Sequence, residues 1–224
     1  MEENCEKKYP KRHRDRFIKI LEYVIIWRTP ILVLRQNNKY NMVTQEFITQ
    51  HIKKGQISII AGRPSTGKTS LAISICINLA QNGEKTLFVS LELSAEQIKE
   101  RFFNNDKIKD LEKCIKIDDT RDMSTKRDIS INYLRSEIES TKANYVIIDY
   151  IQLMSSDKNE LKKIFTELTR IASDNNVSIL LLSQLSRHVE ETNPPTLKDL
   201  LFLQECNFEG IDVVFINQYD KSGL

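Results

Sequence analysis

Residues 62–69 read Gly-Arg-Pro-Ser-Thr-Gly-Lys-Thr, which matches the pattern G-x-x-x-x-G-K-[ST] at every fixed position. Glycines let the backbone curl closely around phosphate groups, and consecutive N–H groups then form a nest for an anion. In this pattern the lysine reaches the β- and γ-phosphates of a nucleotide and the last hydroxyl binds magnesium. We therefore expect ATP and Mg²⁺ at this loop, with Lys68 on the phosphates and Thr69 on the metal. The predicted nucleotide contacts are Gly62, Arg63, Pro64, Ser65, Thr66, Gly67, Lys68, Thr69 and Ser70.

The segments on both sides of this loop fit its requirements. Residues 56–61 form an apolar run typical of a buried strand, and residues 69–81 carry apolar side chains at helical spacing. Asn82 and Gly83 then end the helix, because glycine readily takes the left-handed conformation that follows a helix. The positive end of the helix would face the same phosphates, as a phosphate-binding loop requires.

Apolar runs alternate with helical patterns along the rest of the chain. Ser94 predicts the start of one helix, with Gln97 at the position that completes a capping box. Further helices are predicted over residues 126–142 and 159–173. The further predicted strands cover residues 86–91, 114–117, 145–150, 178–183 and 212–216. Short apolar strands joined by helices indicate an α/β fold, with a mostly parallel twisted sheet and helices on both faces.

Three polar residues follow predicted strands, and the carboxyl ends of parallel strands share one edge of a sheet. Asp149 ends the run Val-Ile-Ile-Asp, so it is expected to bind magnesium together with Thr69. Glu92 is the candidate for orienting an attacking water, unless it only favours the start of the next helix. Gln184 is the candidate for contacting the γ-phosphate, unless it is an ordinary loop residue. The predicted catalytic residues are thus Glu92, Lys68 and Gln184, and the predicted metal ligands are Thr69 and Asp149.

Composition narrows the class of protein. The chain has 224 residues, is 40% hydrophobic and carries a formal charge of +2, so net charge gives no argument for nucleic-acid binding. The four cysteines form no C-x-x-C pair, which argues against a zinc site or a disulfide framework and favours a reducing compartment. No signal peptide and no uninterrupted apolar span is found, so we expect a cytoplasmic protein without membrane contact.

The N-terminal region predicts an arm ahead of the ATPase domain, with a boundary between residues 1–44 and residues 45–224. Residues 1–16 are rich in lysine and arginine, which indicates either a solvated arm or a contact with nucleic-acid phosphates. Apolar residues at helical spacing predict an amphipathic helix over residues 17–26, and Pro30 would stop it. That helix would pack either on its own domain or on a neighbouring subunit.

The order of four motifs resembles the RecA-like motor domain of DnaB-type replicative DNA helicases. Besides the phosphate loop, these motifs are Ser-Leu-Glu-Leu at 90–93, Ile-Asp-Tyr-Ile-Gln-Leu-Met at 148–154 and Ser-Gln-Leu-Ser-Arg at 183–187. The resemblance covers about residues 55–216 and is more specific than the phosphate loop alone.

The resemblance implies an ATP-hydrolysing helicase in DNA replication that moves along single-stranded DNA. It implies a homo-oligomer, usually a ring of six subunits, and contacts with other replication proteins. It assigns phosphate and magnesium to Lys68 and Thr69, water activation to Glu92, magnesium to Asp149 and γ-phosphate sensing to Gln184. It also makes residues 17–26 comparable to the linker helix that docks on the adjacent subunit.

Two departures from the family pattern leave other functions open. The loop at residues 155–159 is shorter than the basic loop that contacts DNA in the family, and no Lys-x-Arg segment follows the last predicted strand. That segment supplies an arginine finger, which can be worth roughly 10³–10⁵ in rate in other NTPases. We therefore also consider a weakly active or non-enzymatic module that joins a complete helicase. A RecA-like ATPase of the recombination, repair or clock type is the third reading.

Overall fold

A single sheet forms the centre of the protein. The computed structural model describes residues 23–26, 29–31, 51–103, 106–119, 130–185, 195–200 and 211–217. The strands are β1 (Tyr23–Ile26), β2 (Thr29–Ile31), β3 (Ile57–Gly62), β4 (Thr86–Ser90), β5 (Ile115–Asp118), β6 (Tyr145–Asp149), β7 (Ser178–Gln184) and β8 (Asp212–Asn217). They form one eight-stranded sheet in the order β2-β1-β8-β3-β7-β6-β4-β5.

Six neighbouring strands, from β8 to β5, run parallel to one another. The chain leaves β3 and returns three positions away as β4, while β8 adds to the other side of β3. The strands β4 to β7 therefore lie on one side of β3 and β8 lies on the other, so the strand order reverses at β3. In parallel α/β sheets, ligands bind beyond the carboxyl ends of the strands at such a point.

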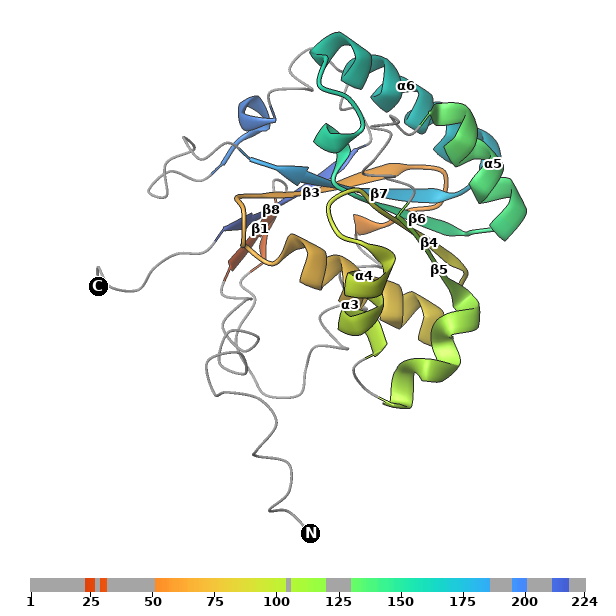
Figure 1. Cartoon of the computed structure of the whole chain (residues 1–224). Coiled ribbons are helices and arrows are strands. Elements are labelled where there is room, and N and C mark those ends of the chain that lie inside the picture. The colour runs from red at the N-terminus through yellow and green to blue at the C-terminus, as the bar shows by residue number, and fades with distance from the viewer. Residues whose placement is uncertain are drawn as a thin grey trace, which may run out of the picture.

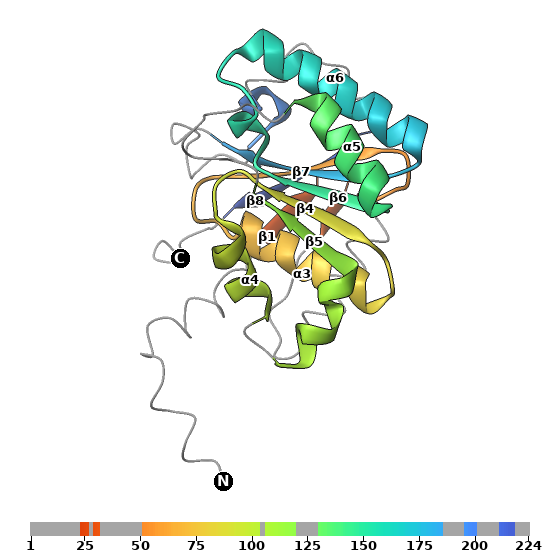
Figure 2. The same cartoon turned by 45° about the vertical axis from the view of Figure 1, so that its right-hand side comes forward.

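Helices cover both faces of the sheet (Figures 1 and 2). One face carries α3 (Lys68–Gln81) and α4 (Ala95–Phe103), and the opposite face carries α5 (Ile131–Thr141) and α6 (Lys158–Asn175). In the described part of the chain, the connections also contain the 3-10 helices η1 (Asp106–Cys114), η2 (Ile151–Leu153) and η3 (Leu197–Asp199). The predicted α/β fold with a mostly parallel, two-sided sheet is confirmed.

The core has two layers because successive side chains of a strand point to opposite faces. Along β7, Ile179 and Leu181 join the apolar cluster under α5 and α6, while Leu180 and Leu182 join the cluster under α3 and α4. The other parallel strands at the sheet centre alternate in the same way. Burial on both faces explains why these strands are almost wholly apolar in sequence.

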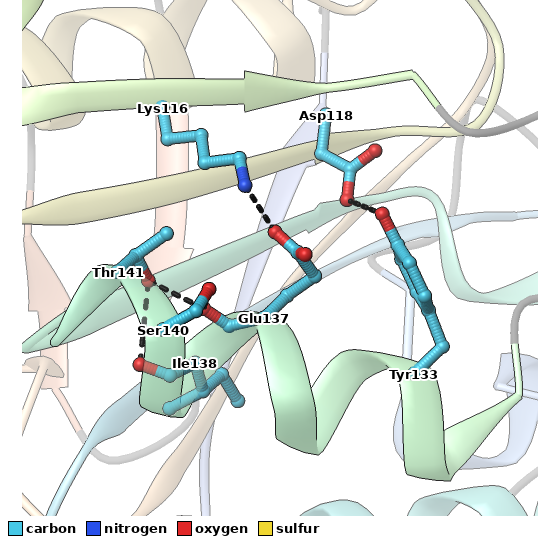
Figure 3. Close-up of polar contacts among 7 residues, drawn as sticks. All are labelled: Lys116, Asp118, Tyr133, Glu137, Ile138, Ser140 and Thr141. Atoms are coloured by element: carbon cyan, nitrogen blue, oxygen red, sulfur yellow. Dashed lines mark hydrogen bonds and ion pairs between the residues drawn. The ribbon is translucent and has the colours of Figure 1, made fainter.

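Polar contacts fasten α5 to the edge strand β5, as Figure 3 shows. The Tyr133 hydroxyl donates to Asp118 at 2.9 Å, and Lys116 forms an ion pair with Glu137. These two contacts fix a helix that otherwise buries only two residues, Leu134 and Ile138, among its eleven.

Most predicted helix ends agree with the structure. Ser94 and Gln97 form the expected capping box, with Ser94 N donating to Gln97 Oε1 at 3.0 Å and Gln97 N donating to Ser94 Oγ at 3.3 Å. The helix predicted over residues 126–142 is observed from Ile131, after the N-cap Ser130. Residues 126–129 lie outside the described residues. No helix in the described ranges combines the length and the apolar character that crossing a membrane requires.

The predicted helix over residues 17–26 is wrong for its last four residues. Tyr23–Ile26 is strand β1, which pairs antiparallel with β8 on one side and with β2 on the other. Aromatic and β-branched residues favour a strand where a sheet edge supplies hydrogen-bond partners, and β8 supplies that edge. Pro30 lies in β2, at the end of the strand order, where an N–H group is not needed on the outer side. Residues 17–22 lie outside the described residues.

Candidate active site

The loop between β3 and α3 has the backbone of an anion nest. Ser65 has φ 64° and Gly67 has φ 93°, both in the left-handed region. Gly67 is the N-cap of α3 and has no side chain to cap the helix. The amides of the first helical turn, which includes Thr69 and Ser70, are thereby left to a ligand of negative charge.

Gly62 is required because the chain passes very close to it. A Cβ atom at this position would lie 2.6 Å from Thr66 Oγ1 and 2.8 Å from the carbonyl oxygen of Ile216. Thr66 is itself fixed, since its hydroxyl donates to the carbonyl of Arg63 at 2.8 Å. The first residue of the loop is thus packed between the loop itself and the end of β8.

Lys68 is buried, with 7% of its surface exposed, and its ammonium lies over the start of the loop. Nζ donates to the carbonyls of Gly62 at 2.9 Å and Arg63 at 2.8 Å. Burial lowers the pKa of Lys68 from 10.5 to about 8, while the negative charges of Asp149 and Glu92 act in the opposite direction. A buried cation that keeps its charge at neutral pH is suited to binding phosphate oxygens.

Thr69 and Asp149 meet across 80 residues of sequence. The Thr69 hydroxyl donates to Asp149 Oδ2 at 2.8 Å, and Asp149 is 1% exposed at the end of β6. Burial raises the pKa of Asp149, the hydrogen bond from Thr69 lowers it, and the nearby charge of Glu92 raises it further. A hydroxyl and a carboxylate oxygen side by side are donors that magnesium prefers, so this pair fits the expected metal.

A magnesium ion at this site would have few protein ligands. Among the residues that the structure describes, no group of three or more His, Cys, Asp or Glu residues gathers in a way that could hold a metal alone. Mg²⁺ commonly uses one or two protein ligands together with substrate phosphates. The donor set therefore fits a metal that arrives with a nucleotide.

Glu92 is exposed beyond the end of β4, on the same edge of the sheet. The turn that carries it is fixed by Ser90, whose hydroxyl donates to the carbonyl of Leu93 at 2.7 Å and accepts from its N–H at 3.3 Å. Burial causes the largest pKa shift of both buried groups, downward for Lys68 and upward for Asp149. The negative charge of Glu92 raises both pKa values. Glu92 is therefore near the two buried charges while its carboxylate remains open to water.

Gln184 ends β7 directly beside the phosphate loop. It stands opposite Gly62 in the parallel ladder between β7 and β3, and the next N–H group, that of Leu185, donates to the Gly62 carbonyl at 3.0 Å. Arg187, the last residue of the motif at 183–187, lies outside the described residues.

Sequence reasoning assigned no role to Gln152, although it lies in one of the motifs. Its side-chain amide contacts both Ser183 and Gln184, 31 and 32 residues later in the chain. The sequence signal that could have identified it was its place in the motif at residues 148–154, directly after the strand that ends in Asp149.

The structure thus brings the phosphate loop, Asp149, Glu92 and Gln184 to one edge of the sheet. A buried cation and helix-start amides can bind phosphate groups, and a hydroxyl–carboxylate pair can bind a hard metal. An exposed carboxylate beside them can orient water. This combination of groups suits the cleavage of a phosphoanhydride bond.

Comparison with known proteins agrees with this chemistry. The family model described as "ATPase: KaiC" matches residues 43–206. A "probable plasmid replicative DNA helicase" of Chlamydia trachomatis is 33% identical over 201 residues, which cover 76% of this chain and 45% of the relative. The replicative DNA helicase DnaB of Synechocystis is 32% identical over 185 residues, or 68% of this chain and 21% of that protein.

A solved structure, titled as an ATPase domain, has the same fold. It superimposes with a TM-score of 0.59 and 26% sequence identity, over 73% of this chain and 69% of that one. The chain spans less than half the length of the curated helicase relatives that it matches.

Proposed function

Because this chain belongs to the KaiC-type ATPase family and carries the RecA-like ATPase domain of DnaB-like replicative helicases, we propose that it binds ATP with magnesium and hydrolyses it while acting on single-stranded DNA. The observation that carries the proposal is the hydrogen bond of 2.8 Å between Thr69 and Asp149. It joins the end of the phosphate loop to the end of β6, which is where a nucleotide-bound metal is needed.

Each of these residues has a separate role in hydrolysis. Lys68 and the backbone of residues 62–70 bind and orient the triphosphate. Thr69 and Asp149 would hold Mg²⁺, which neutralises charge on the phosphates. Glu92 orients the attacking water and accepts its proton, and Gln184 contacts the γ-phosphate. Positioning and electrostatic stabilisation account for most catalysis of phosphoryl transfer, so fixed geometry at the strand ends is what matters.

The proposed role in DNA replication rests on the relatives. Several of them are named replicative DNA helicases, and a solved structure with the same fold is titled as a DnaB-like replicative helicase with its interactions with primase. We propose that this chain likewise works in the cytoplasm as a homo-oligomer, in the form of a ring, with contacts to other replication proteins. Hydrolysis would then take place at interfaces between subunits.

Measuring phosphate release with magnesium, with and without single-stranded DNA, tests the proposal. We expect turnover that single-stranded DNA stimulates and that Lys68→Met abolishes. Light scattering with a non-hydrolysable ATP analogue should report a species several times the mass of the monomer. Tight nucleotide binding with negligible turnover would instead favour a module that joins a complete helicase, and absence of nucleotide binding would refute the proposal.

A further inference from the structure

The ladder between β6 and β7 ends before β7 does. Its last pair is Ile148 opposite Leu181, after which β6 reaches Asp149 and the chain turns into η2. β7 continues to Gln184, and β3 pairs with it on its other side. The edge of β7 that faces β6 therefore needs hydrogen-bond partners from elsewhere at its last residues.

The side chain of Gln152 supplies these partners. Its Nε2 donates to the Gln184 carbonyl at 3.0 Å, and its Oε1 accepts from the Gln184 N–H at 3.2 Å. Nε2 also donates to the hydroxyl of Ser183 at 2.9 Å, and Ser183 is fully buried. A primary amide has the same donor and acceptor as a peptide group. The Gln152 side chain therefore takes the place of the missing strand residue of β6.

This contact completes a closed path around the site. The Gly62 carbonyl accepts from Lys68 Nζ at 2.9 Å and from Leu185 N at 3.0 Å, which ties the phosphate loop to the end of β7. Gln152 ties the end of β7 to η2, directly after the strand that ends in Asp149. The hydrogen bond from Thr69 to Asp149 returns the path to the loop.

We propose that Gln152 is a positioning residue, which holds the backbone of Gln184 so that the Gln184 side chain meets the γ-phosphate. The inference rests on the proposed function, since it gives Gln184 the sensing role. The new element is that the preference for ATP over ADP depends on the side-chain amide of Gln152, a residue that is not among the predicted nucleotide contacts. Loss of that amide frees the end of β7 from the strand that carries the metal ligand.

Binding measurements test this without relying on turnover. The affinities of a non-hydrolysable ATP analogue and of ADP, each with magnesium, are compared by titration calorimetry. We expect the wild type to prefer the ATP analogue. Gln152→Leu keeps the size of the side chain but removes all three hydrogen bonds. It should reduce this preference about tenfold, which is only part of the free energy of three hydrogen bonds, because the loss affects binding through the position of Gln184 alone.

A double-variant cycle separates positioning from a general loss of stability. Gln184→Ala should lose the same preference, and the variant with both changes should lose no more than either alone, because the two residues act through one contact. If Gln152→Leu does not fold, Gln152→Glu serves in its place. It keeps the size and one acceptor but loses the donor to Gln184 and Ser183.

Asn144→Leu is a matched control at the other end of β6. Asn144 is also half-buried, and its side-chain amide also contacts backbone, since its Oδ1 accepts from Lys85 N at 3.3 Å. This variant should lower the melting temperature and leave the preference for the ATP analogue unchanged.

The outcomes distinguish this inference from the proposed function. A folded Gln152→Leu or Gln152→Glu variant with the wild-type preference would overturn the role of Gln152 alone. A wild type that binds neither nucleotide would overturn the proposed function and this inference together. A wild type that binds but does not hydrolyse ATP would leave the binding comparison fully valid, and the loss of preference would then support the inference.

Discussion

The two ends of the parallel sheet are built in different ways. At the carboxyl ends of the strands, Lys68 and Asp149 are buried charges, and the backbone at Ser65 takes a left-handed conformation. At the amino ends, the charged pair of Lys54 and Glu84 is 3.6 Å apart and stays partly exposed. His51 and Lys53 lie 3.9 and 4.0 Å from Asp212 at the start of β8, and the other contacts there include hydrogen bonds between strands and turns.

This difference shows which end of the sheet is adapted to a ligand. Burying a charge costs free energy unless a partner or ligand compensates for it, and an exposed ion pair contributes little. The carboxyl end therefore carries features that are unfavourable for folding alone and favourable for binding a metal–triphosphate. At the amino end, the lysine and acidic side chains of the described ion pairs stay partly exposed, and burial lowers the pKa of His51, which favours its neutral form. Paired substitutions at the two ends can test this contrast.

The largest contrast is expected between two glutamates. Glu92→Gln should reduce turnover about 10²–10⁴-fold, the usual contribution of a general base, because the amide cannot accept a proton from water. Nucleotide affinity should change less than about threefold, since Glu92 does not bind the phosphates. Glu84→Gln, at the amino end, should leave turnover within about twofold. Phosphate release and calorimetry measure both effects, and wild-type turnover in Glu92→Gln would remove Glu92 from the mechanism.

Two lysines give the next contrast. Lys68→Met should weaken binding of the ATP analogue about 100-fold, because charge-assisted hydrogen bonds to phosphate are lost. Its free energy of unfolding should stay within about 1 kcal/mol of the wild type, since removal of a buried charge also removes a desolvation cost. Lys54→Met should bind nucleotide normally. Equal affinities in the two variants would contradict the assignment of Lys68.

Substitutions of two glycines test how closely the backbone is packed at the two ends of the sheet. Gly62→Ala forces a Cβ against Thr66 and the backbone of Ile216, so it should destabilise the fold by about 1–3 kcal/mol and weaken nucleotide binding. Gly83→Ala, after α3, meets no atom within 4 Å, and its cost of about 1 kcal/mol comes only from its φ of +78°. Urea unfolding measures both. Normal nucleotide binding by Gly62→Ala would mean that the loop tolerates displacement.

The smallest expected effect is the pH dependence of nucleotide affinity and of stability. The pKa of Lys68 is lowered to about 8 by burial, so nucleotide affinity should fall as the pH rises through 8, by at most about tenfold per unit. Stability should change in the other direction. Between about pH 8 and 10.5 the unfolded chain binds more protons at this residue, so its contribution to stability rises with pH. Lys68→Met should lose the pH dependence of affinity, and a wild-type slope in that variant would assign it to another group.

Local patterns were sufficient to predict the parallel sheet and the phosphate loop. The strands around Ile59, Ile147 and Leu181 are buried on both faces, so each reads as a continuous apolar run that a single sequence can reveal. The loop at residues 62–69 has a fixed pattern because its backbone geometry and its chemistry both restrict the residue types. The placement of Asp149 followed from the rule that parallel strands end at one edge.

Features set by tertiary partners could not be predicted in the same way. Tyr23–Ile26 has a helical period, but pairing with the edge of β8 makes it a strand. The start of α4 is fixed partly by Asp119, whose carboxylate accepts from Ala95 N at 2.6 Å across 24 residues. The contact of Gln152 with Gln184 depends on where a ladder ends, which no local pattern encodes. The catalytic roles of Glu92, Lys68 and Gln184 stay predictions.

The central claim is that Thr69 and Asp149 form one metal site with a bound triphosphate, and calorimetry with a non-hydrolysable ATP analogue tests it most directly. Magnesium should tighten binding to the wild type at least about tenfold, and Thr69→Ser, which keeps the hydroxyl, should retain this gain. Asp149→Asn should lose most of it, while its affinity without magnesium stays close to that of the wild type. A wild type whose affinity ignores magnesium, or an Asp149→Asn variant with the full gain, would contradict the claim.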